Sequence, residues 1–320
     1  MPQLAIGVDL GGTNARAAVV NRDSGEIVAA HKEPHRERSL QAVIETVAYA
    51  VRQSAAAAAI PPGALGHVGV GVAGQVLGKT GVVLNAPNLG WRNVPLGEEL
   101  ERALQARVRI ANDLSAAAWG ERRFGAARGV DDAALVFVGS GVGSGLILGG
   151  RLHEGHHGVA GELGHVKVRP MRPGTPVRRC GCGELSCLEA YASGVNIAAR
   201  VREELERGAA TAVRDLMQGD LERVNASIVD RAHAQGDPYA LALWEEVAEL
   251  LGTAIAALVT LLNPARIILG GGVILACPEL YRLSREVFAA KVSRSAAVGL
   301  SVERAFLGDD AGVIGAALLE

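Results

Sequence analysis

The stretch GVDLGGTNARAAVV, residues 7–20, carries the pattern that decides the fold. Apolar residues on both sides of the glycine pair predict two buried strands, 4–10 and 14–21, joined by a tight turn at Gly11-Gly12. Asp9 stands at the end of the first strand, where an apolar residue would be expected. Because an unpaired buried carboxylate is costly, something must neutralise Asp9.

Two explanations for Asp9 remain open. Arg16 in the second strand can pair with it, or Asp9 can cap a turn. Alternatively, Asp9 faces a magnesium ion that arrives with ATP and is held through water, since magnesium keeps much of its hydration. The adjoining glycines favour the second explanation, because backbone N–H groups without side chains in the way can bind a polyphosphate. The candidate nucleotide-binding residues of this turn are Asp9, Gly11, Gly12, Thr13 and Asn14.

Composition excludes several classes of protein. The chain has 320 residues, 49% of them hydrophobic, which is enough for more than one ordinary core. Its 32 Lys and Arg against 34 Asp and Glu predict no nucleic-acid partner. No uncharged apolar run reaches the ~18 residues of a membrane span, and no leader precedes the strand at Leu4, so we expect a cytoplasmic protein without a membrane partner.

The strand–glycine–strand pattern occurs twice. The second copy begins at residue 133 and includes GSGVGSG (139–145). This weak internal symmetry predicts an α/β fold with two halves and a cleft between them. We expect a small N-terminal domain, 1–113, completed by a C-terminal helix at about 308–320, and a large domain, 114–307. Strands are predicted at 4–10, 14–21, 26–31, 67–74, 81–87, 108–112, 265–272 and 300–307, and helices at 39–58, 96–106, 113–124, 194–207, 211–218, 222–235, 239–262, 279–291 and 310–319.

Two further glycine clusters follow strands. GSGVGSG offers a second phosphate cradle, and GGGV (270–273) offers a third surface of backbone N–H groups. Any one cluster is explained as well by a tight turn, but three at strand ends favour nucleotide binding. The candidates here are Ser140, Gly141, Gly270, Gly271 and Gly272.

A carboxylate stands where another strand ends and a helix begins, in VRIANDLSAAAWGE (108–121). Asn112 or Asp113 at this place can be an ordinary helix N-cap. The functional alternative is that Asp113 accepts a proton from a substrate hydroxyl. A helix N-terminus favours the anionic form and makes a weak base, which suffices because phosphoryl transfer depends more on positioning the hydroxyl than on basicity.

A histidine and three cysteines are spaced like the ligands of a metal. Cys180, Cys182 and Cys187 form C-x-C-x4-C, and His165 precedes them in a loop rich in Gly and Pro. Three thiolates and one imidazole complete a closed tetrahedral site, which predicts structural zinc. Buried thiols or a redox pair are the alternative. The isolated Cys277 is expected to be a packed core thiol.

Acidic side chains flank the cysteine cluster. A polyhydroxylated substrate needs several hydrogen-bond acceptors, which Glu162 and Glu189 would supply, with an amide from Asn88. If zinc holds His165, it also fixes Glu162 nearby. Each acid alone is explained equally well as an exposed or ion-paired side chain.

Taken together, these motifs are similar to those of the ROK family of bacterial sugar kinases and repressors. They occur in the family's order and span nearly the whole chain. The motifs are DLGGTN (9–14), APNLGW (86–91), AND (111–113), GSGVGSG (139–145), GELGH (161–165), CGCG (180–183), CLEAYASG (187–194), GGGV (270–273) and GDDAGVIGAA (308–317).

The resemblance implies an actin-like, hexokinase-like ATPase fold with two ribonuclease H-like domains, and ATP and sugar in the cleft between them. It implies ATP-dependent phosphorylation of a hexose at its 6-hydroxyl, with glucose the leading substrate. Asp113 resembles the family's catalytic base. Sugar-contacting positions correspond to Gly74, Asn88, Asn112, Asp113, Glu162, His165 and Glu189. The zinc ligands correspond to His165, Cys180, Cys182 and Cys187. We also expect a homodimer or higher homo-oligomer.

The chain departs from the family pattern at a few positions. Ala73 stands where Pro is common, Ser140 replaces Thr, and Ser186 replaces Gly in the last zinc turn, so its backbone must accommodate a side chain. The loop from His165 to Cys180 is longer than usual. None of these changes removes a ligand or the base.

Other functions remain as alternatives. Kinases for N-acetylmannosamine or fructose share most of these residues, since the pocket around the sugar's 2-substituent decides the substrate. A DNA-binding regulator of this family would need an N-terminal helix-turn-helix, whereas a strand begins at Leu4. A sugar sensor without catalysis is disfavoured by the presence of Asp9, Asp113 and the glycine loops.

Overall fold

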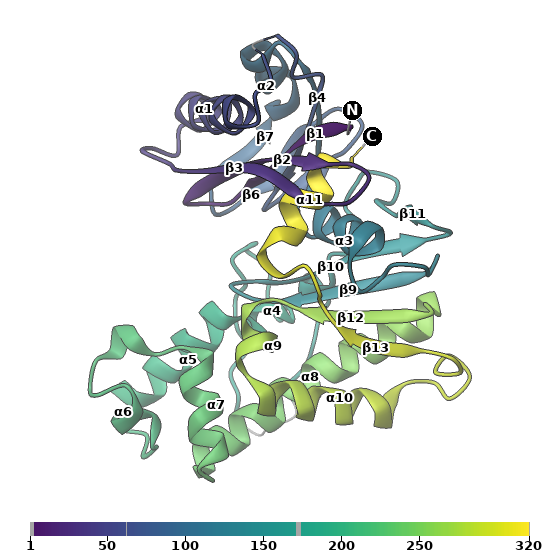
Figure 1. Ribbon diagram of the computed structural model, residues 1–320. Helices are drawn as coiled ribbons and strands as arrows, with labels where there is room; N and C mark the ends of the chain where they lie inside the picture. Colours follow the sequence, from purple (N-terminus) through teal and green to yellow (C-terminus); the bar gives the residue numbers. More distant parts are fainter. Residues whose placement is uncertain (1–2, 62, 171–173, 320) are drawn as a thin grey trace. The chain divides into compact units, whose positions relative to one another are not determined.

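The computed structural model describes residues 3–61, 63–170 and 174–319 (Figure 1). Contacts between Cα atoms divide the chain into two compact units. Unit 1 comprises Met1–Leu135, Gly145–Gly161 and Ala305–Glu320, and unit 2 comprises Val136–Ser144 and Glu162–Arg304. The end of the chain therefore belongs to the same unit as its beginning.

A five-stranded sheet with the order β3-β2-β1-β4-β8 forms the centre of unit 1. β1, β2 and β3 are antiparallel, whereas β1, β4 and β8 run parallel, with Leu10 paired to Val72 and Val72 paired to Asn112. The carboxyl ends of these three parallel strands thus lie at one edge of the sheet. The strands are β1 (Leu4–Leu10), β2 (Asn14–Asn21), β3 (Ile27–Pro34), β4 (His67–Val72) and β8 (Arg107–Asn112).

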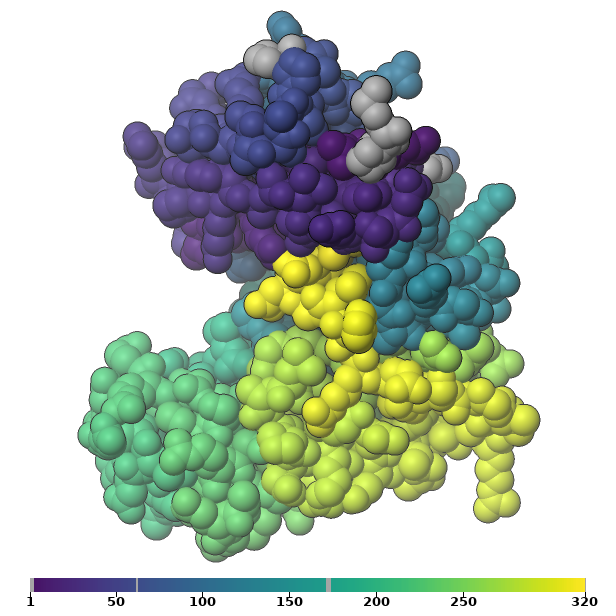
Figure 2. All heavy atoms as spheres, in the orientation of Figure 1, coloured from purple at the N-terminus to yellow at the C-terminus, as the bar shows by residue number. Residues whose placement is uncertain are grey.

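Helices cover both faces of this sheet. α1 (Leu40–Ala57) and α2 (Leu96–Leu104) share one apolar cluster with the strands, because their buried residues recur at helical spacing. α3 (Asp113–Phe124) and α11 (Ala311–Ala317) belong to the other face, where Val313 and Leu318 pack on Ala5 and Val20. In Figures 1 and 2 the yellow C-terminal segment lies directly against the purple first strands. A small antiparallel sheet completes unit 1 with β5 (Gln75–Leu77), β6 (Val82–Ala86) and β7 (Trp91–Val94).

A second five-stranded sheet has the order β11-β10-β9-β12-β13, and the division between the units passes through β9 and β10. In unit 2, α8 and α10 pack closely on each other, since a Cβ at Gly252 would lie 2.7 Å from the Val287 side chain. The strands are β9 (Ala133–Val138), β10 (Val142–Leu148), β11 (Arg151–Leu152), β12 (Arg266–Gly270) and β13 (Ser301–Arg304). The helices of unit 2 are α4 (Glu189–Ala192), α5 (Gly194–Glu206), α6 (Val213–Leu216), α7 (Ala226–Ala234), α8 (Pro238–Leu262), α9 (Gly272–Ala276) and α10 (Pro278–Lys291), with 3₁₀ turns at Leu163–His165 and Leu221–Arg223. A third 3₁₀ turn, Gly308–Asp310, belongs to unit 1.

Most predicted elements form where the sequence places them, but β13 ends at Arg304 and not at 307. Its extension is prevented because the buried Glu121 accepts hydrogen bonds from the backbone N–H groups of Phe306 and Leu307, at 2.9 and 2.8 Å. β5, β7, β11, α4 and α9 were not predicted as separate elements. They have two to five residues each, too few for a periodic pattern to show.

The contact-based units assign α3 to unit 1, whereas the boundary predicted after Asp113 assigns it to the second domain. The physical reason is close packing of α3 on α11, where a Cβ at Gly120 would lie 2.5 Å from the carbonyl oxygen of Ala311. The boundaries of independently folding domains stay a prediction. In the part of the chain that the structure describes, every helix is too short or too polar to span a membrane.

Candidate functional site

Unit 1 gathers the first set of candidates at one edge of its sheet. The β1–β2 turn, the end of β4 and the end of β8 are adjacent there, because the parallel strands are in register. The Gly11-Gly12 turn lies beside Asn88, since a Cβ at Gly12 would be 2.8 Å from the Asn88 Cβ. Asn112 contacts the loop between β4 and β5, where its Nδ2 donates to the carbonyl oxygen of Gly74 at 3.1 Å. Ligands of parallel α/β sheets bind at such edges.

Asp9 is half-buried beside the β1–β2 turn. Burial raises the pKa of its carboxyl, while the charges of Arg16 and Lys32 lower it. Arg16 is the cross-strand neighbour of Asp9, yet its guanidinium bonds to the carboxylate of Asp310 at 2.5 Å. Arg16 therefore lowers the pKa of Asp9 by its charge, while its ion pair is formed with Asp310. A further cation near Asp9 would offset the remaining cost of burying the carboxylate.

The sequence left open whether Asn112 or Asp113 caps α3, and the hydrogen bonds of the two side chains answer this question. Asn112 is the N-cap of α3, and its Oδ1 accepts from the backbone N–H groups of Leu114 and Ser115 at 2.9 and 3.1 Å. Asp113 is the first residue of the helix, and its Oδ1 lies 3.0 Å from the Leu114 nitrogen. The capping role thus belongs to Asn112, and the positive end of the helix dipole favours a charged Asp113.

In unit 2 the other two glycine clusters are adjacent. A Cβ at Gly139 would lie 3.8 Å from the nitrogen of Gly272, so the β9–β10 loop meets the turn between β12 and α9. Gly271 has a φ of 89°, and a Cβ there would lie 2.5 Å from the carbonyl oxygen of Val138. Both its conformation and this contact require glycine at position 271.

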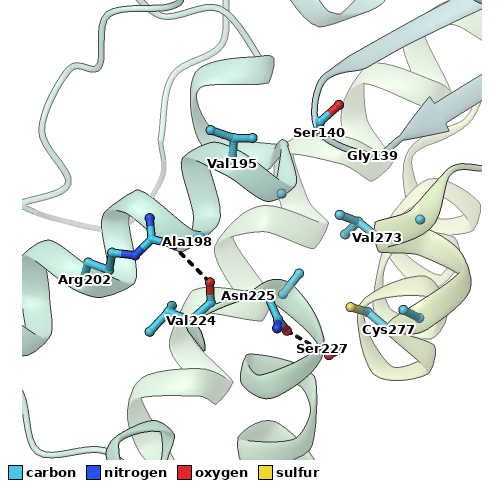
Figure 3. Close-up of a pocket in the computed structure, with 14 residues that line it drawn as sticks. Gly139, Ser140, Val195, Ala198, Arg202, Val224, Asn225, Ser227, Val273 and Cys277 are labelled. Carbon is cyan, nitrogen blue, oxygen red and sulfur yellow. Dashed lines mark hydrogen bonds between the residues drawn. The ribbon is translucent and has the colours of Figure 1, made fainter. Parts of the chain in front are cut away.

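A cavity of about 530 Å³ opens beside these loops within unit 2. Its walls are mostly apolar: Figure 3 shows Val195 and Ala198 of α5 across from Val273 and Cys277. Asn225 is already engaged, since its Oδ1 caps α7 and accepts from the Ser227 hydroxyl at 2.8 Å. A flat, largely apolar ring fits such walls, with polar groups only at the edges.

The cavity was missed by sequence reasoning, apart from the loops that border it. Its lining comes from α5, α7 and α9, whose residues are ordinary helix formers. Cys277, predicted to be a packed core thiol, is fully buried, and burial raises the pKa of the thiol to about 12. This thiol is therefore protonated near neutral pH and forms part of the cavity wall.

The four candidate metal ligands come together in unit 2. One ligand atom from each of His165, Cys180, Cys182 and Cys187 lies within 4.8 Å of all the others. Separations of 3.8 Å join Cys182 Sγ to Cys187 Sγ and Cys180 Sγ to His165 Nδ1. Such spacings fit the corners of a tetrahedron around one zinc ion.

The surroundings of this cluster also suit a metal. Burial raises the pKa of the Cys180 and Cys187 thiols, so a cation is needed to favour the thiolate forms. With His165 Nδ1 facing the cysteines, its Nε2 lies 3.4 Å from the Glu162 carboxylate, which would orient the ring. Ser186, which replaces a glycine of the family pattern, has a φ of 61°, so this turn has a left-handed backbone at a residue with a side chain.

Glu189 links the cysteine cluster to a glycine loop. Its Oε1 lies 3.5 Å from Cys180 Sγ, and its Oε2 accepts from the backbone N–H of Val142 at 2.9 Å. Both partners belong to unit 2. The sequence predicted a sugar-contacting role for Glu189, but no pattern indicated this second contact.

Sequence reasoning also missed how the loop before Cys180 is anchored. Thr175 donates to the buried Glu246 at 3.0 Å, and Glu246 forms a two-pronged ion pair with Arg200 at 2.9 Å. These residues are far apart in the chain, so periodicity gives no signal for them. Residues 171–173 of the same loop lie outside the described residues.

Comparison with known proteins agrees with these features. The sequence profile of the ROK family matches residues 5–320. Glucokinase of Streptomyces coelicolor is 36% identical over 278 residues, covering 84% of this chain and 82% of that protein. Glucokinase of Thermotoga maritima is 34% identical over 319 residues, covering 99% and 97%.

Structural comparison gives the same result. A ROK family glucokinase from Streptomyces griseus, in complex with glucose and AMPPNP, has a TM-score of 0.79 and 34% identity, with 98% of each chain covered. The actin-like, hexokinase-like α/β fold expected from the sequence is thereby confirmed. The match over nearly the whole length leaves one conclusion: the chain belongs to the ROK family.

Proposed function

We propose that this protein transfers the terminal phosphoryl group of ATP to the 6-hydroxyl of glucose. The observation that carries the proposal is the cavity of unit 2, which adjoins two glycine loops and has apolar walls suited to a nucleobase. The relatives and the Streptomyces griseus structure, named as glucokinases, support the same activity.

The glycine loops would hold the phosphates of the nucleotide. Ser140, Gly141 and Gly270–Gly272 lie in glycine-rich turns, which suit the close approach of backbone N–H groups to a polyphosphate. The β1–β2 turn of unit 1 supplies Gly11, Gly12, Thr13 and Asn14 to the same set. Magnesium carried by the nucleotide would offset phosphate charge, and Asp9 would be the carboxylate that faces it.

Asp113 would act as the base. Its carboxylate accepts the proton of the 6-hydroxyl while the hydroxyl oxygen attacks the terminal phosphorus and the bond to the leaving nucleoside diphosphate breaks. Because the transition state of phosphoryl transfer is loose, aligning the hydroxyl matters more than a high pKa of the base. Asp113 is the first residue of α3, and this fixed helix start would supply the alignment.

The sugar would be held by polar groups around its ring. Glu162, Glu189 and His165 would accept or donate to ring hydroxyls from unit 2, and Gly74, Asn88 and Asn112 would do so from unit 1. Zinc bound by His165, Cys180, Cys182 and Cys187 would fix the part of unit 2 that carries Glu162, His165 and Glu189.

A related substrate is the alternative. N-acetylmannosamine or fructose would use most of the same residues, and a sugar sensor without catalysis would use the same pocket. A homodimer or larger assembly and a cytoplasmic location stay predictions, the first of them checked by light scattering after gel filtration.

The deciding experiment is an assay of ADP release with glucose, fructose, mannose, N-acetylmannosamine and N-acetylglucosamine. We expect the highest kcat/KM with glucose. Turnover with N-acetylmannosamine or fructose above that with glucose would replace the proposed substrate, and no turnover with any sugar would contradict a kinase.

A further inference from the structure

The loop Gly139–Val142 is held at both ends by one segment of unit 2. At its beginning, the backbone N–H of Gly194 donates to the carbonyl oxygen of Gly139 at 2.8 Å. At its end, the Glu189 Oε2 accepts from the N–H of Val142 at 2.9 Å. The segment from Cys187 to Gly194, which carries a candidate zinc ligand, therefore fixes the shape of a candidate phosphate loop.

The backbone of Glu189 is also held in place. Its carbonyl oxygen accepts from the backbone N–H of Ser193 and from the Asn196 Nδ2, each at 3.1 Å. Its carboxylate fills the space beside Gly141, where a Cβ would lie 2.7 Å from Oε2. A charged acceptor held this firmly forms a strong, directional hydrogen bond with the Val142 N–H.

We propose that Glu189, besides its proposed contact with sugar, is a positioning residue for the nucleotide: it holds the Gly139–Val142 loop in the shape that binds phosphate. This inference rests on the proposed function. It assigns one carboxylate to both substrates, so the affinities for sugar and nucleotide depend on a shared side chain. Coupling of this kind is reciprocal.

The first test measures binding of AMPPNP in the absence of any sugar, by calorimetry on the zinc-loaded protein. For Glu189→Ala we expect the Kd to rise about 10-fold, because the Val142 N–H loses its charged acceptor. Glu189→Gln keeps an oxygen that can accept from Val142, so we expect it to restore most of the affinity. Zinc content and melting temperature are measured alongside.

The matched control is Glu162→Ala. Like Glu189, Glu162 is a carboxylate that we propose contacts the sugar, and it too lies close to a candidate zinc ligand, His165. We expect its AMPPNP affinity without sugar to stay within about twofold of the wild type. An unchanged AMPPNP affinity in Glu189→Ala would overturn the inference, and so would equal losses in the Glu162 and Glu189 variants.

A second test approaches the contact from the loop and does not need Glu189 to be replaced. In Gly141→Ala the new methyl group pushes the Glu189 carboxylate away, so we expect glucose to bind about 5-fold more weakly without nucleotide. Gly272→Ala is its control, since a Cβ there meets no atom within 4 Å. Equal glucose affinity in both variants would contradict the inference, whereas a wild type that binds no AMPPNP would contradict the proposed function instead.

Discussion

Asn112 and Asp113 are neighbours in the sequence but differ in what their side chains do. Asn112 satisfies two N–H groups of α3, so replacing it would affect the helix. Asp113 is not the cap, and its half-buried carboxylate stands at the edge where the parallel strands end. Its replacement should therefore affect chemistry more than stability.

For Asp113→Asn we predict a loss of kcat of about 10²- to 10⁴-fold, because the amide cannot accept the hydroxyl proton. The Kd for glucose, measured by calorimetry, should change by no more than a few fold. Asp23→Asn, at an exposed turn of the same unit, is the control and should keep full activity. Wild-type kcat in Asp113→Asn would refute the assignment of the base.

Single residues are predictable where the residue type itself carries the chemistry. Three cysteines and a histidine indicate a metal site by their type and spacing, and the structure brings their ligand atoms together. Which of Asn112 and Asp113 caps α3 depends on the residue at which the helix begins, and the sequence pattern does not fix that start to one residue. The Thr175–Glu246 contact joins remote parts of the chain and is equally invisible in the sequence.

At the scale of elements, the described residues of the loop that carries the four candidate ligands form little regular structure. It contains a 3₁₀ turn and isolated bridges such as Lys167 to Cys187, and its Val166, Val177 and Leu185 side chains are exposed. A bound ion would replace the missing core, as in other small metal-stabilised segments.

We predict one zinc per chain by elemental analysis. Cys182→Ser should lose the zinc and raise the KM for glucose, because the loop that carries Glu162 and His165 is no longer held. The control is Cys277→Ser, which changes a thiol of the cavity wall and should keep the zinc. A metal-free preparation with full activity and unchanged KM would contradict the structural role.

The start of α8 depends on a single carboxylate. Asp237 is the N-cap, and it accepts from the Ala240 N–H, the Ala212 N–H and the Thr211 hydroxyl at 2.8–2.9 Å. Burial alone would raise the pKa of Asp237, but these hydrogen bonds outweigh it and hold the pKa below the ordinary 3.8. The folded protein thus favours the charged form.

Asp237→Asn should lower the free energy of unfolding by about 1–2 kcal/mol at pH 7. Since the folded-state pKa lies below the unfolded one, the contribution of Asp237 is complete above about pH 4 and is lost as pH falls through the folded value. Urea titrations of both proteins from pH 7 to 3 measure this, and the difference should shrink at the acid end. Asp215→Asn, exposed on α6, should have little effect at any pH.

Element types followed from periodicity, whereas several boundaries did not. The end of β13 is set by Glu121, which lies far away in sequence and withdraws two N–H groups from the sheet. α9 follows Gly271, whose left-handed φ turns the chain abruptly, so the glycine run signals both a strand end and a new helix.

At the scale of the molecule, unit 1 is assembled from three separate parts of the chain. α11 lies so close to the sheet and to α3 that glycines are needed at the contacts: a Cβ at Gly69 would be 1.8 Å from the carbonyl oxygen of Ala316, and one at Gly315 would be 1.7 Å from that of Ala116. The sequence shows these glycines but not the backbone atoms they contact. From the sequence alone they would therefore be assigned to turns or strands.

Gly315→Ala should therefore lower the free energy of unfolding by about 3 kcal/mol or more, because the methyl group meets backbone that cannot move aside. Gly312→Ala on the same helix is the control, since its Cβ would meet Asp9 at an ordinary 3.6 Å. Thermal unfolding of both variants measures the difference. Equal melting temperatures would mean that α11 is not held as tightly as these distances require.

The late position of α11 in the chain has a consequence for synthesis. A ribosome produces β1, β4 and α3 long before it produces residues 305–320, so the nascent first unit waits with one apolar face uncovered. Every residue of unit 2 has been translated by then. Unit 1 thus begins to be made first and is completed last. The time needed to translate unit 2 sets how long a chaperone or protease can reach the uncovered apolar face of unit 1.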